Sequence, residues 1–197
     1  MTMLVVQIRP HAFRGAEMLL YVDLSDNRLS SIDGAFAGLR QLSRLDLRNN
    51  RLTEITQFTF RDQTNLRYLL LSENHIVHVD RRAFRGLEKL MYLVLHRNPI
   101  GSVHRFQFQF HSLFLSYVDL SECHLATVPR GLPASIRYLQ LRRNNMTAID
   151  RTSFRDCPYV SILVLDENAI SEVSNIIHVN FPPWVGSTNH DGRSGLD

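Results

Sequence analysis

One short pattern recurs along the chain and constrains its fold more than any other feature. Seven stretches follow the form Leu-x-x-Leu-x-Leu-x-x-Asn-x-Leu, with Val, Ile or Met in place of some leucines and one Cys in place of Asn. The anchors are separated by 23, 24, 24, 25, 21 and 24 residues. A repeat of this length cannot bury its apolar face alone, so neighbouring copies must stack into one shared core. The anchors are Asn27, Asn50, Asn74, Asn98, Cys123, Asn144 and Asn168.

Each column of this frame has a physical role. The alternation of apolar and other residues in the Leu-x-Leu segment predicts a short strand in every copy, and the strands should pair side by side as a parallel sheet. The chain must turn after each strand, and a buried Asn offers both a donor and an acceptor to the backbone of that turn. Cys123 fits the volume but is a weaker donor and acceptor, so the Asn ladder should be weaker there.

The arm that returns each copy to the next strand also has a pattern. Asp33, Asp80 and Asp150 are each followed three or four residues later by a Phe, which predicts a short helical turn with an Asp N-cap and a Phe in the core. Cys157 occupies the place that Leu87 has in the third copy. We therefore expect both cysteines to be small buried apolar side chains.

The two ends of the chain depart from the frame. Ile8, Phe13 and Gly15 align with Val79, Phe84 and Gly86, so the sequence begins within a repeat, and no polar or disulfide-bonded cap is visible at either end. We assign residues 1–179 to one repeat domain, and we expect residues 180–197, which are rich in Gly, Ser and Pro, to form a flexible tail. From these features we expect a fragment or an incomplete gene model rather than a naturally capless protein.

The seven copies resemble the 24-residue class of leucine-rich repeats that is common in extracellular proteins. The shorter fifth copy, with Val128–Pro129 and Leu132–Pro133, is similar to repeats of small leucine-rich proteoglycans, and such mixtures also occur in Toll-type, Slit-type and chaoptin-type ectodomains. The resemblance implies an α/β repeat fold: a right-handed solenoid, or horseshoe, with a parallel β-sheet on its concave face. It also implies binding of other proteins, with no catalytic residues.

Side chains between the strand aliphatics should point out of the concave face. Counting from the first Leu of each copy, the third column contains five of the six tyrosines, a residue enriched at interface hot spots. A ladder of tyrosines that stabilises the sheet is the alternative reading, and the two are compatible. The predicted protein-binding residues are Tyr21, Arg44, Arg48, Tyr68, Leu70, Tyr92, Val94, His96, Tyr117, Tyr138 and Arg142.

The fifth column indicates where on this face a ligand would bind. Leu70 and Val94 occupy it in the third and fourth copies, whereas Asp23, Asp46 and Asp119 occupy it elsewhere. All of these are expected to face water. An exposed aliphatic pair beside tyrosines predicts a binding patch, with the charged seventh and eighth columns as its rim.

Composition excludes several other functions. A net charge of +3 gives no support to a nucleic-acid partner, and no apolar run is long enough to span a membrane. Nearly all basic residues are arginines, which allows a sulfated glycan as a less favoured partner. The histidines are scattered over different surfaces, and no phosphate-binding loop or hydrolase motif appears, so we predict no metal, no cofactor and no enzymatic activity.

Two functions remain open from sequence. The favoured one is an extracellular or cell-surface recognition module, of receptor or matrix type, and the other is an intracellular scaffold that assembles protein partners. Asn145-Met146-Thr147 is an N-glycosylation sequon, which favours the first, whereas the chain as written has no signal peptide, which leaves a cytoplasmic location open.

Overall fold

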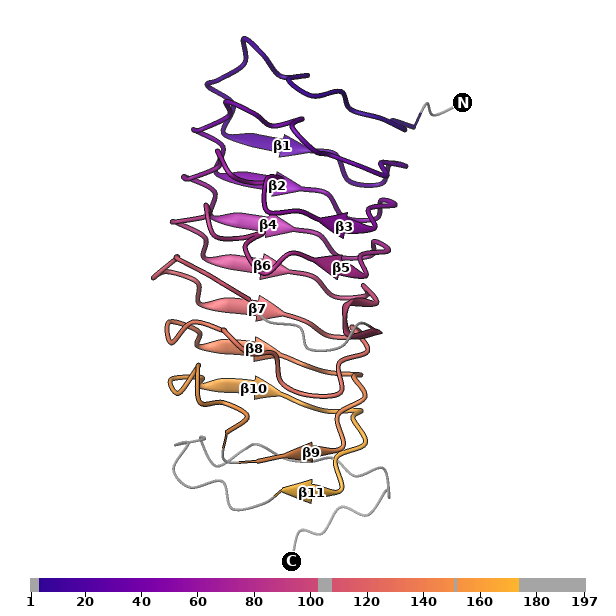
Figure 1. Cartoon of the computed structure of the whole chain (residues 1–197), viewed down its shortest axis with the longest axis vertical. Coiled ribbons are helices and arrows are strands. Elements are labelled where there is room, and N and C mark those ends of the chain that lie inside the picture. The colour runs from indigo at the N-terminus through magenta and orange to yellow at the C-terminus, as the bar shows by residue number, and fades with distance from the viewer. Residues whose placement is uncertain (1–3, 103–107, 151, 174–197) are drawn as a thin grey trace, which may run out of the picture.

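Seven strands, one from each copy, form a single parallel sheet in the computed structural model, which describes residues 4–102, 108–150 and 152–173 (Figure 1). The order along the sheet follows the order along the chain, so each strand pairs with that of the next copy, as predicted. The strands are β1 (Tyr21–Asp23), β2 (Arg44–Asp46), β4 (Tyr68–Leu70), β6 (Tyr92–Val94), β7 (Tyr117–Asp119), β8 (Tyr138–Gln140) and β10 (Ile162–Val164).

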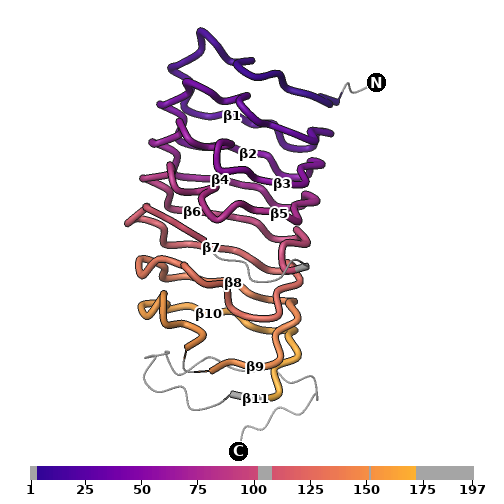
Figure 2. Tube along the Cα trace, viewed as in Figure 1, coloured from indigo at the N-terminus to yellow at the C-terminus, as the bar shows by residue number. Residues whose placement is uncertain are grey.

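The register of the sheet keeps every column of the frame in line. Tyr68 pairs with Tyr92, and Leu69 pairs with Leu93, so residues at equal positions in neighbouring copies lie side by side. The chain makes one turn of the solenoid per copy (Figure 2). As a result, a property that recurs at one position becomes a continuous row across the sheet.

Four shorter strands lie beside the main sheet. β3 (Glu54–Ile55) pairs with β5 (His78–Val79), and β9 (Ala148–Ile149) pairs with β11 (Glu172–Val173), both in parallel. Figure 1 shows β3 and β5 to the right of the main strands and β9 and β11 below β10. These short strands contribute Ile55, Val79 and Ile149, which are buried in the core.

The core is a single apolar cluster between the sheet and the returning arms. The middle residue of each main strand is buried, and Phe36, Phe60, Phe84 and Phe108 fill the opposite side of the core. The Phe84 ring lies 6.4 Å from that of Phe60 and 5.8 Å from that of Phe108, centroid to centroid. Burial of each Leu or Phe side chain stabilises the folded state by about 1.5–3 kcal/mol, so the stacking of copies is the main source of stability.

The returning arms are runs of turns rather than helices. Among the described residues the only helical element is the three-residue 3-10 helix η1 (Ile100–Ser102). Asp80 and Asp150 act as predicted for caps, since each accepts the N–H two residues later at 2.7 Å. Asp33 does not: its carboxylate accepts the Thr59 hydroxyl of the next copy at 2.9 Å, because a threonine there offers a donor across the gap.

The Asn ladder forms as the frame predicts. The Asn74 side-chain amide donates to the carbonyl oxygens of Leu47 at 2.9 Å and Leu71 at 3.0 Å, and its Oδ1 accepts the N–H of Leu52 at 3.0 Å. The residue is only 4% exposed. One side chain therefore satisfies buried backbone groups of two consecutive copies.

Cys123 replaces only part of this arrangement. Its thiol lies 3.3 Å from the carbonyl oxygen of Leu95 and 3.4 Å from that of Ser121. The Ile100 N–H, which an Asn Oδ1 would accept, instead donates to the carbonyl oxygen of Asn98 at 2.8 Å, just before η1. This bond joins residues two apart, so a tight three-residue turn supplies the partner that the missing amide would have given. Both cysteines are free and buried, as predicted.

Residues near the N-terminus continue the same frame. The Val5 N–H donates to Asn27 Oδ1 at 2.8 Å, the bond that Leu52 makes to Asn74. The Phe13 ring stacks on Phe36 at 5.8 Å. The predicted partial copy is therefore present, whereas the predicted tail, 180–197, lies outside the described residues.

Candidate protein-binding face

One face of the seven-stranded sheet displays the third, fifth, seventh and eighth columns, and we call it the open face; the sequence predicts it to be the concave one. Along each strand the middle residue is buried and the residues on either side point to this face. The predicted binding residues from Tyr21 to Arg142 all belong to these columns, so the strand register brings them onto one surface.

The third column is a stacked row of tyrosines. Ring centroids are 5.0 Å apart for Tyr68 and Tyr92, 5.5 Å for Tyr92 and Tyr117, and 5.0 Å for Tyr117 and Tyr138. Each of these four side chains is half-buried, which leaves part of it accessible. Offset stacking of this kind stabilises a sheet, so the predicted ladder is present, and the row also offers a broad amphipathic strip.

The first two copies begin this row differently. Tyr21 is 48% exposed, and the Arg44 guanidinium lies 5.5 Å from the centroid of its ring. The Tyr21 hydroxyl donates to Asp23 at 2.9 Å, and this hydrogen bond raises the pKa of the tyrosine. Burial is the main cause that raises the pKa of Tyr117, so both phenols stay protonated at neutral pH.

Two aspartates of the fifth column are not exposed, contrary to the prediction. Asp46 is fully buried, and Asp119 is only 9% exposed. The guanidinium of Arg48 covers Asp46 and donates to both carboxylate oxygens, at 2.7 Å from Nη2 and 2.8 Å from Nε. Leu70 and Val94 are half-buried rather than open. The fifth-column residues of the aliphatic and acidic copies therefore differ less in their exposure to water than the sequence alone predicts.

From the third copy to the seventh, the eighth column, predicted only to be a rim, forms a ladder of alternating charge. In every copy this residue has a positive φ, between 51° and 57°. Arg97 lies 3.4 Å from Glu73 and 3.2 Å from Glu122, and Arg143 lies 3.7 Å from Glu122 and 2.6 Å from Glu167. The alternation of sign from copy to copy, visible in the sequence, is the signal that predicts these pairs.

The arginines proposed for a sulfated glycan all have carboxylate neighbours in this chain. Arg44 and Arg48 lie 3.8 and 2.7 Å from Asp46, and Arg142 lies 2.8 Å from Asp166 and also pairs with Glu167. Arg97 and Arg143 belong to the eighth-column ladder. A glycan sulfate would have to compete with these carboxylates, so the geometry gives it little support.

His96 lies near the centre of the open face. Its Nε2 is 3.7 Å from Glu73, and its Nδ1 is 3.7 Å from Asp119. Both distances exceed that of a normal hydrogen bond. The described residues contain no group of three or more His, Cys, Asp and Glu side chains arranged to hold a metal ion.

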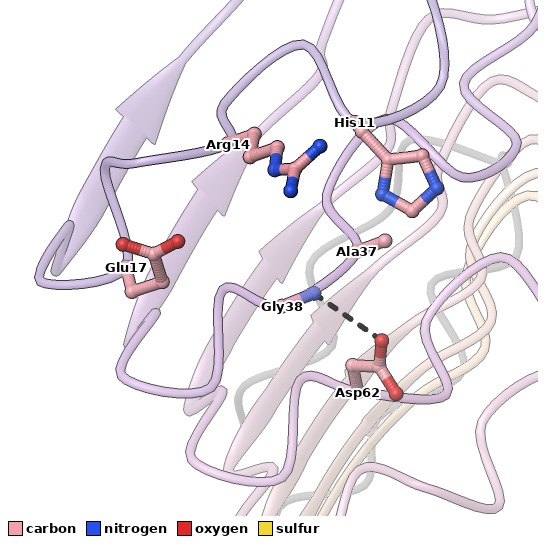
Figure 3. Close-up of a pocket in the computed structure, with 6 residues that line it drawn as sticks. All are labelled: His11, Arg14, Glu17, Ala37, Gly38 and Asp62. Carbon is pink, nitrogen blue, oxygen red and sulfur yellow. Dashed lines mark hydrogen bonds between the residues drawn. The ribbon is translucent and has the colours of Figure 1, made fainter.

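Away from the open face, a shallow hollow of about 390 Å³ lies between the first arms (Figure 3). The Asp62 carboxylate there accepts the Gly38 N–H at 3.2 Å, and Glu17 accepts the Gly15 N–H at 3.0 Å. These acids hold backbone groups in place, so we assign the hollow no ligand. Its lining residues are His11, Arg14, Glu17, Ala37, Gly38 and Asp62.

Two further features bear on location. Asn145, the predicted glycosylation residue, is exposed next to the buried Asn144, and Thr147 of the sequon is exposed as well. In the part of the chain that the structure describes, no helix is long and apolar enough to cross a membrane.

Comparison with known proteins decides the class of this fold. The model of the leucine rich repeat family matches residues 4–52 and 40–100. The chain contains leucine-rich repeats and has the leucine-rich repeat fold. Among curated proteins, its repeats are similar to decorin from Canis lupus familiaris, at 36% identity over 61 residues, and from Equus caballus, at 37% over 68 residues. These matches cover 31% and 34% of this chain but only 17% and 19% of the decorin chains.

Solved leucine-rich repeat structures confirm the solenoid over most of the chain. Toll in its complex with Spatzle, from Drosophila, superposes with a TM-score of 0.73 and 21% identity, covering 86% of this chain and 24% of that one. Human 5T4 superposes with a TM-score of 0.67 and 24% identity, covering 87% of this chain and 67% of that one. At these identities the likeness establishes the shared leucine-rich repeat fold.

Proposed function

We propose that the chain is a protein-binding module that recognises a protein partner through the open face of its sheet. The row of four stacked, half-exposed tyrosines next to Leu70 and Val94 is the observation that carries this proposal. Tyrosines held in this way contribute large contact areas with little loss of side-chain entropy, which suits an interface. The proposed function is binding and includes no catalytic step.

Similar structures support a binding role. One is the complex of Toll with Spatzle, and another is the LRIM1/APL1C complex, which superposes with a TM-score of 0.62 at 20% identity. Because the similarity to decorin covers less than a fifth of that protein, we carry over neither its partners nor its other activities.

We also propose that the protein acts outside the cell or at its surface. The support comes from the decorin and Toll matches and from the exposed sequon at Asn145. Glycopeptide mass spectrometry of the protein from its natural source tests this, since only the secretory pathway attaches an N-linked glycan. Protein that carries no glycan at Asn145 and resides in the cytosol would instead favour the intracellular scaffold.

A screen against an array of purified extracellular domains tests the binding proposal. We expect at least one domain to bind the wild-type chain and to lose binding to the double variant Tyr68→Ala, Tyr92→Ala. Tyr159→Ala is the matched control, because Tyr159 is 64% exposed but lies outside the columns of the open face. Binders that respond equally to both variants, with folding confirmed by circular dichroism, would overturn the proposal.

A further inference from the structure

Three aspartates occupy the fifth column, and each accepts the same local hydrogen bond. Oδ1 accepts the N–H two residues later: Ser25 at 3.0 Å for Asp23, Arg48 at 3.2 Å for Asp46, and Ser121 at 2.9 Å for Asp119. The second oxygen, Oδ2, is then available for another donor. The three copies differ in what meets it.

In the first two copies the chain supplies that donor itself. The Tyr21 hydroxyl donates to Asp23 Oδ2 at 2.9 Å. The Arg48 guanidinium donates to Asp46 Oδ2 from Nη2 at 2.7 Å and from Nε at 3.1 Å. The second copy therefore shows that the fifth-column carboxylate and the seventh-column site can accommodate a guanidinium.

In the fifth copy that place is not filled by the described part of the chain. Position three is Tyr117, whose hydroxyl accepts a hydrogen bond from Gln140 Nε2 at 3.2 Å instead of pairing with Asp119. Position seven is Ser121, whose side chain carries no positive charge. The group nearest to Oδ2 among the ion pairs is His96 Nδ1 at 3.7 Å, and the Asp119 side chain is 13% exposed. Its carboxylate thus faces the open face without a close donor.

A second observation points to the same spot. Among the described residues, three buried side-chain polar atoms lack a hydrogen-bond partner: Ser72 Oγ, His96 Nδ1 and Ser121 Oγ. They are the seventh-column residues of three consecutive copies, and Ser72 and Ser121 are 1% and 8% exposed. By contrast, the equivalent Ser25 hydroxyl donates to Asp23 at 2.6 Å. Buried polar groups are nearly always partnered, so this row has unused hydrogen-bonding capacity.

We propose that Asp119 receives an arginine side chain from a protein partner, which takes the place that Arg48 occupies at Asp46. This inference rests on the proposed function and adds the chemistry of the partner. Arginine is preferred over lysine because a planar guanidinium can pair with the carboxylate through two bonds, as at Asp46, and can also stack on an aromatic ring. The stacked Tyr92 and Tyr117 adjoin Asp119 on the same face.

Local charge favours the same ligand. Glu73, Asp119 and Glu122 lie around His96 and Ser121. The guanidinium groups near them are those of Arg97, which is shared between the two glutamates, and of Arg143, which lies 3.7 Å from Glu122; neither forms an ion pair with Asp119. This part of the open face is therefore acidic, whereas the second and sixth copies supply their own arginines. A cationic side chain would be drawn to the centre of the face and kept from its ends.

Peptides selected for binding to the chain from a phage-displayed random library provide the probe. We expect the selected peptides to share an arginine. Replacing that arginine with citrulline, which has nearly the same shape but no charge, should weaken binding to the wild-type chain by about tenfold or more. On the Asp119→Asn variant the two peptides should bind alike, whereas on the matched Asp23→Asn control the tenfold difference should remain.

Ser121→Arg is a second variant that leaves the carboxylate in place. It recreates the Asp46 and Arg48 arrangement at the fifth copy, so the chain would fill the site itself and the arginine peptide would lose its advantage over citrulline. Folding of each variant is checked by circular dichroism.

The outcomes separate this inference from the proposed function. One outcome is that Tyr92→Ala weakens peptide binding, but the peptides lack arginine or bind equally well with citrulline in its place. That result would overturn the role of Asp119 and leave open-face binding intact. Peptides that are insensitive to Tyr92→Ala would count against the proposed function itself. A citrulline effect that persists on Asp119→Asn would place the arginine elsewhere and overturn the inference.

Discussion

The carbonyl oxygen of Phe108 occupies the space in which a side chain at Gly131 would begin. A Cβ atom built at Gly131 would lie 2.0 Å from that oxygen, and the glycine has a φ of +76°. Gly131 follows Arg130, whose carbonyl oxygen accepts the Phe108 N–H at 3.0 Å. The arms of the fourth and fifth copies thus meet backbone to backbone, which explains why the short fifth copy requires glycine here.

Gly131→Ala should destabilise the solenoid more than the same change at Gly38. Gly38 has a similar φ, +87°, but a Cβ there would meet nothing within 4 Å. Both variants incur the left-handed backbone penalty of about 1–2 kcal/mol. Gly131→Ala adds the overlap with Phe108, roughly 1–3 kcal/mol more. Equal free energies of unfolding in urea for the two variants would refute this steric account.

Asn74→Leu should lower the free energy of unfolding by about 1–3 kcal/mol, because the carbonyl groups of Leu47 and Leu71 and the N–H of Leu52 lose a buried partner. Chemical denaturation measures the loss. Unchanged stability in this variant would remove the structural role that we assign to the Asn ladder.

Cys123→Asn tests the same ladder in the opposite direction. The amide would restore the residue type of the other copies, but the Ile100 N–H already donates to the carbonyl oxygen of Asn98, so we expect a change smaller than about 1 kcal/mol. A large loss of stability would mean that the fifth copy cannot accept the frame residue.

Both thiols should be unreactive in the folded chain. Burial raises the pKa of Cys123 and of Cys157 to about 12, so the reactive thiolate is scarce at neutral pH, and the sulfur atoms are also shielded from reagents. We expect labelling by Ellman's reagent only after denaturation. Rapid reaction of the native protein at either cysteine would contradict the buried placement.

Glu167 should make stability depend on acid pH. Hydrogen bonds from Arg143 and then Arg142 lower its pKa from 4.5 to about 2. The carboxylate therefore stabilises the folded chain fully above pH 4.5, and this contribution is lost as pH falls towards about 2. Because the pair is exposed, the effect should be small and should shrink with added salt. Glu167→Gln should flatten the dependence of urea midpoints over that interval; an identical slope would show no contribution.

The fold follows from the sequence because one frame recurs, and so most of its main features were predictable. Each column has one role in all copies, so the inward aliphatics, the Asn74 ladder and the Tyr68 to Tyr138 row could be assigned before any coordinates. The exposure of Asp46 could not. That exposure depends on the conformation of the flexible Arg48 side chain, which is set by contacts between residues of different columns.

The site was predictable as a face but not in its details. The third-column tyrosines and the central position of His96 follow from strand alternation. The hydrogen bonds that distinguish Asp119 from Asp23 depend on the side chains of the third and seventh columns together. They cannot be predicted when each column is considered separately. The turns after Asp33 likewise depend on Thr59 in the next copy.

The central claim is that the open face binds a protein through its tyrosine row. The most direct test is the Kd of a partner domain from the extracellular array for the wild type, Tyr92→Ala and the exposed control Tyr159→Ala, with circular dichroism and urea midpoints confirming that all three are folded. We predict that Tyr92→Ala raises the Kd about fivefold or more, a loss above about 1 kcal/mol, while Tyr159→Ala leaves it unchanged. Equal Kd values for the wild type and Tyr92→Ala would leave the row a purely structural ladder and place the binding surface elsewhere.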